Sequence, residues 1–138
     1  MFDAIIIGSG PAGLSTALNL QIHEKSFVWF GSRDMSDKIK KAQTIDNYPG
    51  LPGISGMDLG EAMGNHAEKL GIAPVRGKVL AVENAGSEKI IRTKKHEYRA
   101  KTVVLACGAS HRTLDIPGEA ELSGMGVSYC ATCDGAFF

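Results

Sequence analysis

Two cysteines near the end of the chain are the residues best suited to chemistry. Cys130 and Cys133 lie in "GVSYCATCDGAFF", and Asp134 follows them directly. A pair with this spacing can close and reopen as a disulfide, and a lowered thiol pKa would make one sulfur a nucleophile. Asp134 could transfer the proton that dithiol exchange requires, or could simply form the turn in "DG".

Two other roles for the cysteine pair are weaker. A structural zinc site needs four ligands, but the sequence has no second CxxC, and neither Cys107 nor the four histidines show paired ligand spacing. A purely structural disulfide would constrain little chain entropy, because the loop that it closes is so short. The spacing therefore favours redox chemistry, with metal binding as the alternative.

A second chemical motif opens the chain. Gly8, Gly10 and Gly13 form the pattern GxGxxG in "GSGPAG", between an apolar run and a segment of helical periodicity. In such a turn the first glycine permits a tight bend, the second lets backbone approach a pyrophosphate, and the third allows close helix–strand packing. The phosphates would meet free N–H groups at the positive end of the helix. The motif predicts a dinucleotide site.

The acid that usually binds the adenosine ribose is missing. It is expected about 20 residues after the glycine turn, where this chain reads "FGSRD". Asp34 comes late for that role, and Arg33 would suit a 2′-phosphate if it is not simply a surface residue. The glycine turn therefore predicts a dinucleotide without saying which one.

The elements that position these motifs follow an α/β order. A strand, a glycine turn, a helix and a second strand form a βαβ unit, whose right-handed crossover makes the strands parallel. A β-meander is inserted before the last core strand. In chain order we expect a buried strand within 2–10, a helix over about 11–23, a strand at 26–30, a loop at 31–53, a helix from near 57 to 70 with Ser55 as N-cap and Gly71 as its stop, antiparallel strands within 73–84, 88–95 and 96–100, and a buried parallel strand within 101–108.

The bulk composition fits one folded domain without excess charge. Fifteen basic residues balance fifteen acidic ones, so no global field draws the protein to nucleic acid or to a membrane. No apolar run approaches the roughly 20 residues of a membrane span, and the N-terminus lacks the features of a signal peptide. We therefore expect a cytoplasmic location, where a CxxC is catalytic or metal-binding rather than structural.

Together the two motifs resemble those of the low-molecular-weight thioredoxin reductases. The resemblance runs along the whole chain, through "GSGPAGLSTA", "DNYPG", "KTVVLACGAS" and "GVSYCATCDGAFF". It implies a Rossmann-like FAD-binding domain of three layers, in which a parallel sheet carries an inserted antiparallel β-meander. It also implies that Cys130 and Cys133 form the redox-active disulfide reduced by the flavin, with Asp134 as proton donor.

The resemblance further implies the residues that bind the cofactor and the course of the electrons. Electrons would pass from FAD to the disulfide and on to thioredoxin or a similar protein disulfide, which makes the protein an oxidoreductase. The cofactor-binding residues carried over by this likeness are Gly8, Ser9, Gly10, Pro11, Ala12, Gly13, Asn47, Val79 and Gly108.

Two departures bear on the electron donor. Members that use NADPH usually carry a "GGQL"-like stretch after the second strand, whereas this chain has "SDKIKKAQTIDNYPG". The stretch "SFVWFGSRDMSDKIKKA" is closer to the ferredoxin-dependent flavin thioredoxin reductases of anaerobic bacteria. Two basic clusters would suit an acidic electron carrier, although a solvated surface is the simpler explanation. Their members are Lys38, Lys40 and Lys41, and Arg92, Lys94, Lys95, Arg99 and Lys101.

The chain is also shorter than the enzymes that it resembles. In that family the chain leaves the FAD domain, builds a pyridine-nucleotide-type domain and returns to complete the flavin site. We therefore expect residues 1–112 to be the first segment of an FAD domain, incomplete at its C-terminal side. Residues 113–138 would be a linker and the truncated start of the second domain, carrying the CxxC. Such a fragment would not complete a full turnover, and the intact enzyme would be a homodimer.

A non-enzymatic alternative uses the same two motifs. The chain would then be a stand-alone dinucleotide-binding module, whose CxxC senses the redox state or binds a metal. A bound yellow chromophore and donor-dependent disulfide reduction would favour the enzyme, whereas metal in a colourless protein would favour the module.

Overall fold

The computed structural model of the chain describes residues 1–32 and 37–130. Its contacts divide the chain into two units, Met1–Gly108 and Ala109–Phe138, which we describe separately. That residues 113–138 begin a second domain stays a prediction. The elements, all in the first unit, are β1 (Phe2–Ile7), α1 (Pro11–Ile22), β2 (Phe27–Phe30), α2 (Asp37–Lys40), α3 (Gly56–Lys69), β3 (Val79–Ala85), β4 (Glu88–Thr93) and β5 (Glu97–Leu105).

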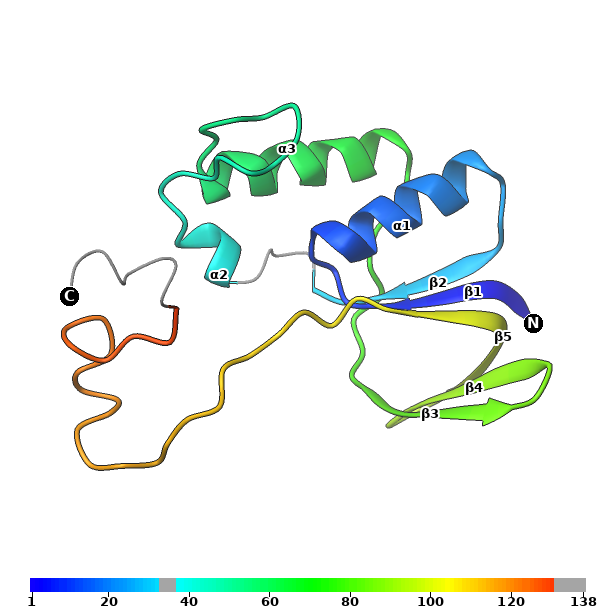
Figure 1. The fold of residues 1–138 in the computed structure, drawn as a ribbon. Helices are drawn as coiled ribbons and strands as arrows, with labels where there is room; N and C mark the ends of the chain where they lie inside the picture. Colours follow the sequence, from blue (N-terminus) through cyan, green and yellow to red (C-terminus); the bar gives the residue numbers. More distant parts are fainter. Residues whose placement is uncertain (33–36, 131–138) are drawn as a thin grey trace. The chain divides into compact units, whose positions relative to one another are not determined.

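Strand β1 lies inside the parallel part of one mixed sheet. The strand order is β2-β1-β5-β4-β3, and β1 pairs in parallel with both β2 and β5. Ile5 and Ile6 are both fully buried, because successive side chains of a strand point to opposite faces and both faces are covered here. Figure 1 shows α1 and α3 above the parallel strands. The predicted α/β class is confirmed.

Local signals at the helix ends match the predicted elements. Pro11 occupies the first turn of α1, where its missing N–H costs nothing. Ser55 caps α3, since its hydroxyl oxygen accepts the N–H of Asp58 at 3.1 Å. Gly71 follows the helix with φ +66°, a conformation that glycine adopts readily. The predicted loop at 31–53 was wrong at one place, because α2 lies within it.

The predicted strands at 96–100 and 101–108 are one continuous strand in the structure. The first half of β5 pairs antiparallel with β4, from Glu97 to Ala100, and the second half pairs in parallel with β1, from Ala100 to Leu105. The predicted strand at 73–84 is instead interrupted. Val75 forms an isolated parallel bridge to Phe30, and β3 begins only at Val79.

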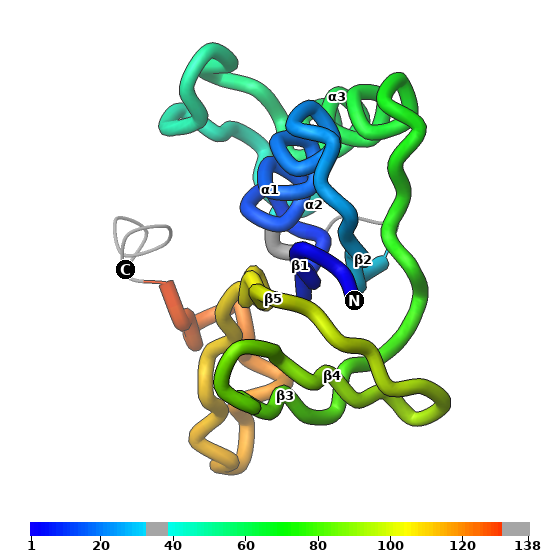
Figure 2. Tube along the Cα trace, turned by 90° about the vertical axis from the view of Figure 1, so that its right-hand side faces the viewer, coloured from blue at the N-terminus to red at the C-terminus, as the bar shows by residue number. Residues whose placement is uncertain are grey.

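Two hydrophobic clusters fill the spaces between three layers. Above the parallel strands, Ile6 and Trp29 pack with residues of α1 and α3. Below them, Ile5 and Phe30 pack with Ile91 of β4 and Ala100 of β5. Figure 2 shows the helices on one side of β1 and the β3–β4 hairpin on the other. The predicted three-layer arrangement with a meander is therefore confirmed.

The second half of β5 has a bare side. From Thr102 onward, β1 is its one strand partner among the described residues. Leu105, at the end of this stretch, is 69% exposed. Among residues 1–32 and 37–130, no strand pairs with the hydrogen-bonding groups that point away from β1.

An ionic contact joins the three parallel strands near their amino-terminal ends. Lys101 donates to the Asp3 carboxylate at 2.6 Å, and the Ser26 hydroxyl and N–H donate to it at 2.7 and 3.0 Å. These donors, Lys101 foremost, hold the pKa of Asp3 well below its ordinary value of 3.8. A lowered pKa means that the contribution to stability is complete above the unfolded value and is lost as the pH falls below it.

We therefore expect Asp3→Asn to reduce stability at neutral pH and to reduce the further loss on acidification. The measurement is the urea midpoint at neutral pH and at about pH 3. Asp46→Asn is the matched control, because Asp46 is exposed in a loop. Equal midpoints for Asp3→Asn and the unchanged chain at neutral pH would contradict this account.

Candidate functional site

The glycine turn lies where the carboxyl ends of three parallel strands meet. Gly8 follows β1 with φ +116°, in the region that side chains disfavour. Its N–H donates to the Phe30 carbonyl at the end of β2, at 2.8 Å. A Cβ at Gly8 would lie 2.0 Å from the Ala106 carbonyl oxygen, just after β5. This crevice is where open α/β sheets bind their ligands.

Trp29 and Gly13 hold the turn from the helix side. The Trp29 Nε1–H donates to the Gly8 carbonyl oxygen at 2.9 Å. A Cβ at Gly13 would lie 1.9 Å from that same oxygen, so a side chain here would push the first turn of α1 off the strand. The role of Trp29 was not predicted, since a tryptophan in a strand usually signals only the core.

Gly10 has open space around it. It is the N-cap of α1 with extended backbone, no side chain caps the helix, and the first turn carries no acidic residue. A Cβ at Gly10 would meet no atom of the described residues within 4 Å. The first N–H groups of α1 are thus available to a ligand, and a helix N-terminus favours negative charge. The Gly8–Gly13 turn fits the pyrophosphate of a dinucleotide.

Tight packing explains the missing acid at the end of β2. A Cβ at Gly31 would lie 2.4 Å from the Ser9 Cβ, so no acidic side chain fits at that position. The Ser32 N–H instead donates to the Ser9 hydroxyl oxygen at 2.9 Å. Arg33 and Asp34, the other residues considered for this corner, lie outside the described residues.

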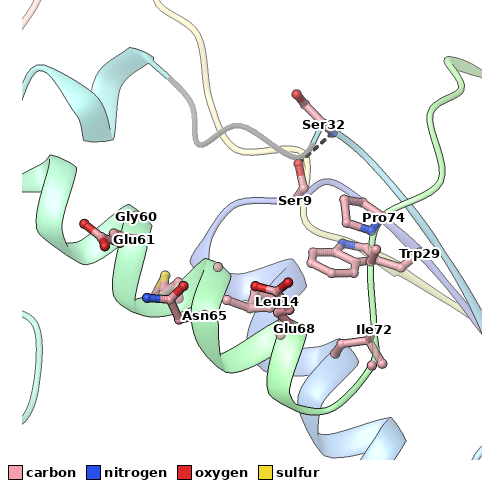
Figure 3. Close-up of a pocket in the computed structure, with 15 residues that line it drawn as sticks. Ser9, Leu14, Trp29, Ser32, Gly60, Glu61, Asn65, Glu68, Ile72 and Pro74 are labelled. Carbon is pink, nitrogen blue, oxygen red and sulfur yellow. Dashed lines mark hydrogen bonds between the residues drawn. The ribbon is translucent and has the colours of Figure 1, made fainter.

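A cavity of about 490 Å³ opens beside this corner. Figure 3 shows the bonded pair Ser9 and Ser32 on one side, Trp29 and Pro74 on another, and residues of α3 across from them. Ser9 is the one predicted cofactor residue among those that line it. The cavity therefore adjoins the glycine turn without including its phosphate-facing part.

Three of the predicted cofactor residues lie outside the segment 8–13, each in a different place. Gly108 follows β5 with φ +69°, two residues after the backbone that contacts Gly8. Val79 begins β3 and packs in the lower cluster. Asn47 is exposed in the loop before α3, and within the described residues no hydrogen bond joins it to the turn. The structure brings Gly108 near the turn, and the cofactor role of all three stays a prediction.

Carboxylates of the same sheet pair with most of the cations in the larger basic cluster. Lys94 and Lys95, in the turn between β4 and β5, have no carboxylate partner among the described ion pairs. The three other cations pair as Arg92 with Glu83 and Glu97 (2.7 and 3.3 Å), Arg99 with Glu88 and Glu97 (2.9 and 3.3 Å), and Lys101 with Asp3 (2.6 Å). The face thus offers an acidic partner less positive charge than the sequence suggests.

The cysteines differ in state. Cys130 is disulfide-bonded, and its N–H donates to the Ser128 hydroxyl at 3.1 Å. Cys107 is an exposed free thiol, which donates to the Ile7 carbonyl at 3.6 Å. Cys133 and Asp134 lie outside the described residues, so their roles stay predictions. Within 1–32 and 37–130, no three His, Cys, Asp or Glu residues gather as metal ligands.

The second unit contains a buried carboxylate that sequence reasoning missed. Glu119 is 6% exposed and accepts the hydroxyl of Tyr129 and three backbone N–H groups. These bonds, the one from Tyr129 foremost, lower the pKa of Glu119. The same bond raises the pKa of Tyr129 to about 12. Between the ordinary pKa of a glutamate and that of a tyrosine, Glu119 is ionised and Tyr129 is protonated, and the hydrogen bond between them contributes fully to stability.

The comparisons with known proteins agree along the whole chain. The model of the pyridine nucleotide-disulphide oxidoreductase family matches residues 2–138. The thioredoxin reductase of Bacillus subtilis is 37% identical over 138 residues, covering 100% of this chain and 44% of that protein. That of Peptoclostridium acidaminophilum is 41% identical over 139 residues, with the same coverage. The chain thus spans less than half the length of these relatives.

Solved structures give the same picture. A ferredoxin-flavin thioredoxin reductase from Clostridium acetobutylicum has a TM-score of 0.76 and 42% identity, covering 99% of this chain and 48% of that one. A thioredoxin reductase from Streptococcus pyogenes has a TM-score of 0.79 and 41% identity, covering 100% of this chain and 45% of that one. Both similarities extend over the glycine turn and the second unit.

Proposed function

Because the chain belongs to the pyridine nucleotide-disulphide oxidoreductase family, we propose that it is the FAD-binding front part of a thioredoxin reductase-like enzyme. Its work in the intact enzyme is to pass electrons from FAD to the Cys130–Cys133 disulfide and from there to thioredoxin. The observation that carries the proposal is the Gly8–Gly13 turn, which is open to a pyrophosphate at Gly10. The disulfide-bonded state of Cys130 supports the second half of it.

The chain's own residues have distinct tasks in this scheme. The N–H groups at the start of α1 hold the pyrophosphate, and the helix dipole favours its charge. Gly8 and Gly13 keep the turn tight enough for the backbone itself to be the binding surface. When bound and reduced by the electron donor, the flavin would supply the two electrons that open the disulfide. Asp134 gives the proton that one of the resulting thiolates needs.

Donor and partners follow from the relatives as proposals. A similar structure is a ferredoxin-flavin thioredoxin reductase, and the chain lacks the stretch typical of NADPH-dependent members. We therefore favour ferredoxin over NADPH as electron donor, and thioredoxin as acceptor. No helix in the described part of the chain has the length and apolarity of a membrane span. The intact enzyme is proposed to be a cytoplasmic homodimer.

The first measurement is the visible spectrum of the purified chain after incubation with FAD and removal of the excess. We expect flavin absorbance to stay with the protein and FAD to be the cofactor released from it. Anaerobic reduction of the bound flavin should then produce two new thiols per chain, counted by alkylation. Cys130→Ser is the control, which should retain the flavin without producing the thiol pair. A protein that stays colourless would contradict flavin binding by this chain.

A further inference from the structure

The buried Glu119 carboxylate closes a loop of the second unit on itself. It accepts the N–H of Leu114 at 2.8 Å, of Asp115 at 2.7 Å and of Ile116 at 3.4 Å. Three successive N–H groups directed at one carboxylate make an anion-binding concavity, here filled by the chain's own side chain. Segment 114–116 is thereby fixed to Glu119.

Tyr129 joins the chain before Cys130 to this fixed segment. Its hydroxyl donates to the Glu119 carboxylate, and its ring stacks on His111 with the centroids 3.8 Å apart and the planes at 14°. One residue is thus held at both its ring and its hydroxyl. We refer to Glu119, Tyr129 and His111 as the Tyr129 clasp.

The backbone between Glu119 and Tyr129 is also held by hydrogen bonds. The Val127 N–H donates to the Leu122 carbonyl at 2.9 Å, and the Gly124 N–H donates to the Val127 carbonyl at 2.9 Å. These bonds turn the chain back after Leu122 and deliver residues 127–130 to Glu119. Cys130 then follows Tyr129 directly, with its N–H bonded to the Ser128 hydroxyl.

We propose that Glu119 and Tyr129 are positioning residues, which hold the backbone at Cys130 in the geometry that closes its disulfide. This inference rests on the proposed function and adds one point to it: the clasp sets how readily the Cys130 disulfide is reduced. Opening the disulfide takes two electrons and two protons and leaves two thiols. A clasp that holds Cys130 in place lowers the entropy lost when the thiols close again, so it favours the disulfide over the dithiol.

The test is the equilibrium of the disulfide with dithiothreitol, in which the dithiol of the reagent becomes its cyclic disulfide as the protein gains two thiols. Protein thiols are counted by alkylation and mass spectrometry across a series of buffers. Tyr129→Phe removes the hydroxyl and keeps the ring on His111. We expect it to favour the dithiol by about tenfold, the size of freeing one residue's backbone, or ~30 mV in potential.

A second variant and a matched control separate positioning from general damage. Glu119→Gln keeps an acceptor for the N–H groups but loses the charge, so we expect a shift in the same direction. It should also return the pKa of Tyr129 from about 12 toward its ordinary 10.0, which a tyrosine titration can follow. Tyr98→Phe makes the same chemical change in β5, where the ring packs against Phe30, and should leave the potential unchanged.

The potentials decide the proposal without any flavin. If neither Tyr129→Phe nor Glu119→Gln changes the equilibrium constant with dithiothreitol by more than about twofold, the proposal is wrong. It is equally wrong if Tyr98→Phe moves the potential as far as Tyr129→Phe does. A chain that binds no FAD would contradict the proposed function and leave this measurement intact.

Discussion

Replacing Gly13 by alanine is expected to destabilise the first unit by about 3 kcal/mol, because the added methyl group has no room. Its Cβ would lie 1.9 Å from the Gly8 carbonyl oxygen and 3.4 Å from the Trp29 Nε1. That oxygen is already the acceptor of the Trp29 N–H. Relief requires α1 to move off the strand, which also breaks this bond and opens the upper hydrophobic cluster.

The fluorescence of Trp29 during urea unfolding measures this effect directly, since the chain has one tryptophan. Gly64→Ala is the matched control, because Gly64 lies inside α3 and a Cβ there meets no atom within 4 Å in the part of the chain that the structure describes. Alanine is the better helix former by about 1 kcal/mol, so this variant should be at least as stable as the unchanged chain. Equal urea midpoints for the two variants would show that the turn has room for a Cβ at Gly13.

Replacing Gly10 by alanine should instead spare the fold and weaken FAD binding about a hundredfold. Its φ of −72° and ψ of −175° suit alanine, and none of residues 1–32 and 37–130 lies within 4 Å of the added Cβ. The loss of stability should stay near 1 kcal/mol, the usual cost of alanine at an N-cap. The methyl group would stand between the pyrophosphate and the N–H groups, and losing such charge-assisted bonds costs about 3 kcal/mol.

Titration of each protein with FAD, followed by quenching of flavin fluorescence, measures this affinity. Tyr98→Phe, near the start of β5 and in its antiparallel half, is the control and should bind FAD as the unchanged chain does. Unfolding of Gly10→Ala in urea must be measured alongside, so that lost binding is not confused with lost structure. If Gly10→Ala bound FAD with unchanged affinity, the pyrophosphate would not bind at the glycine turn.

Elements with strong local signals could be predicted from the sequence. The β1–α1 turn was predicted because its glycine spacing has one steric meaning, and α3 because Ser55 and Gly71 mark both of its ends. The continuity of β5 could not be predicted, since the change from an antiparallel to a parallel partner at Ala100 depends on residues distant in sequence. Helix α2 was missed because four residues carry no useful periodicity.

The same limit applies to the site. Glycine types and spacing indicated the turn, but the bond from Trp29 to the Gly8 carbonyl depends on how β2 lies against β1. The clasp at Tyr129 left no periodic pattern, because it joins residues ten positions apart across irregular backbone. The geometry around Gly31 explains afterwards why the acid is absent, a reason that the sequence alone does not contain.

The bare side of β5 also governs how this chain behaves among its own copies. Unpaired strand edges pair with any extended segment that reaches them. Here the edge from Thr102 ends at Leu105, which is 69% exposed, and the chain has no formal net charge to keep copies apart. Pairing of copies through this stretch, as through the outer edge of β3, would lower solubility in concentrated solution, and covering the stretch should raise it.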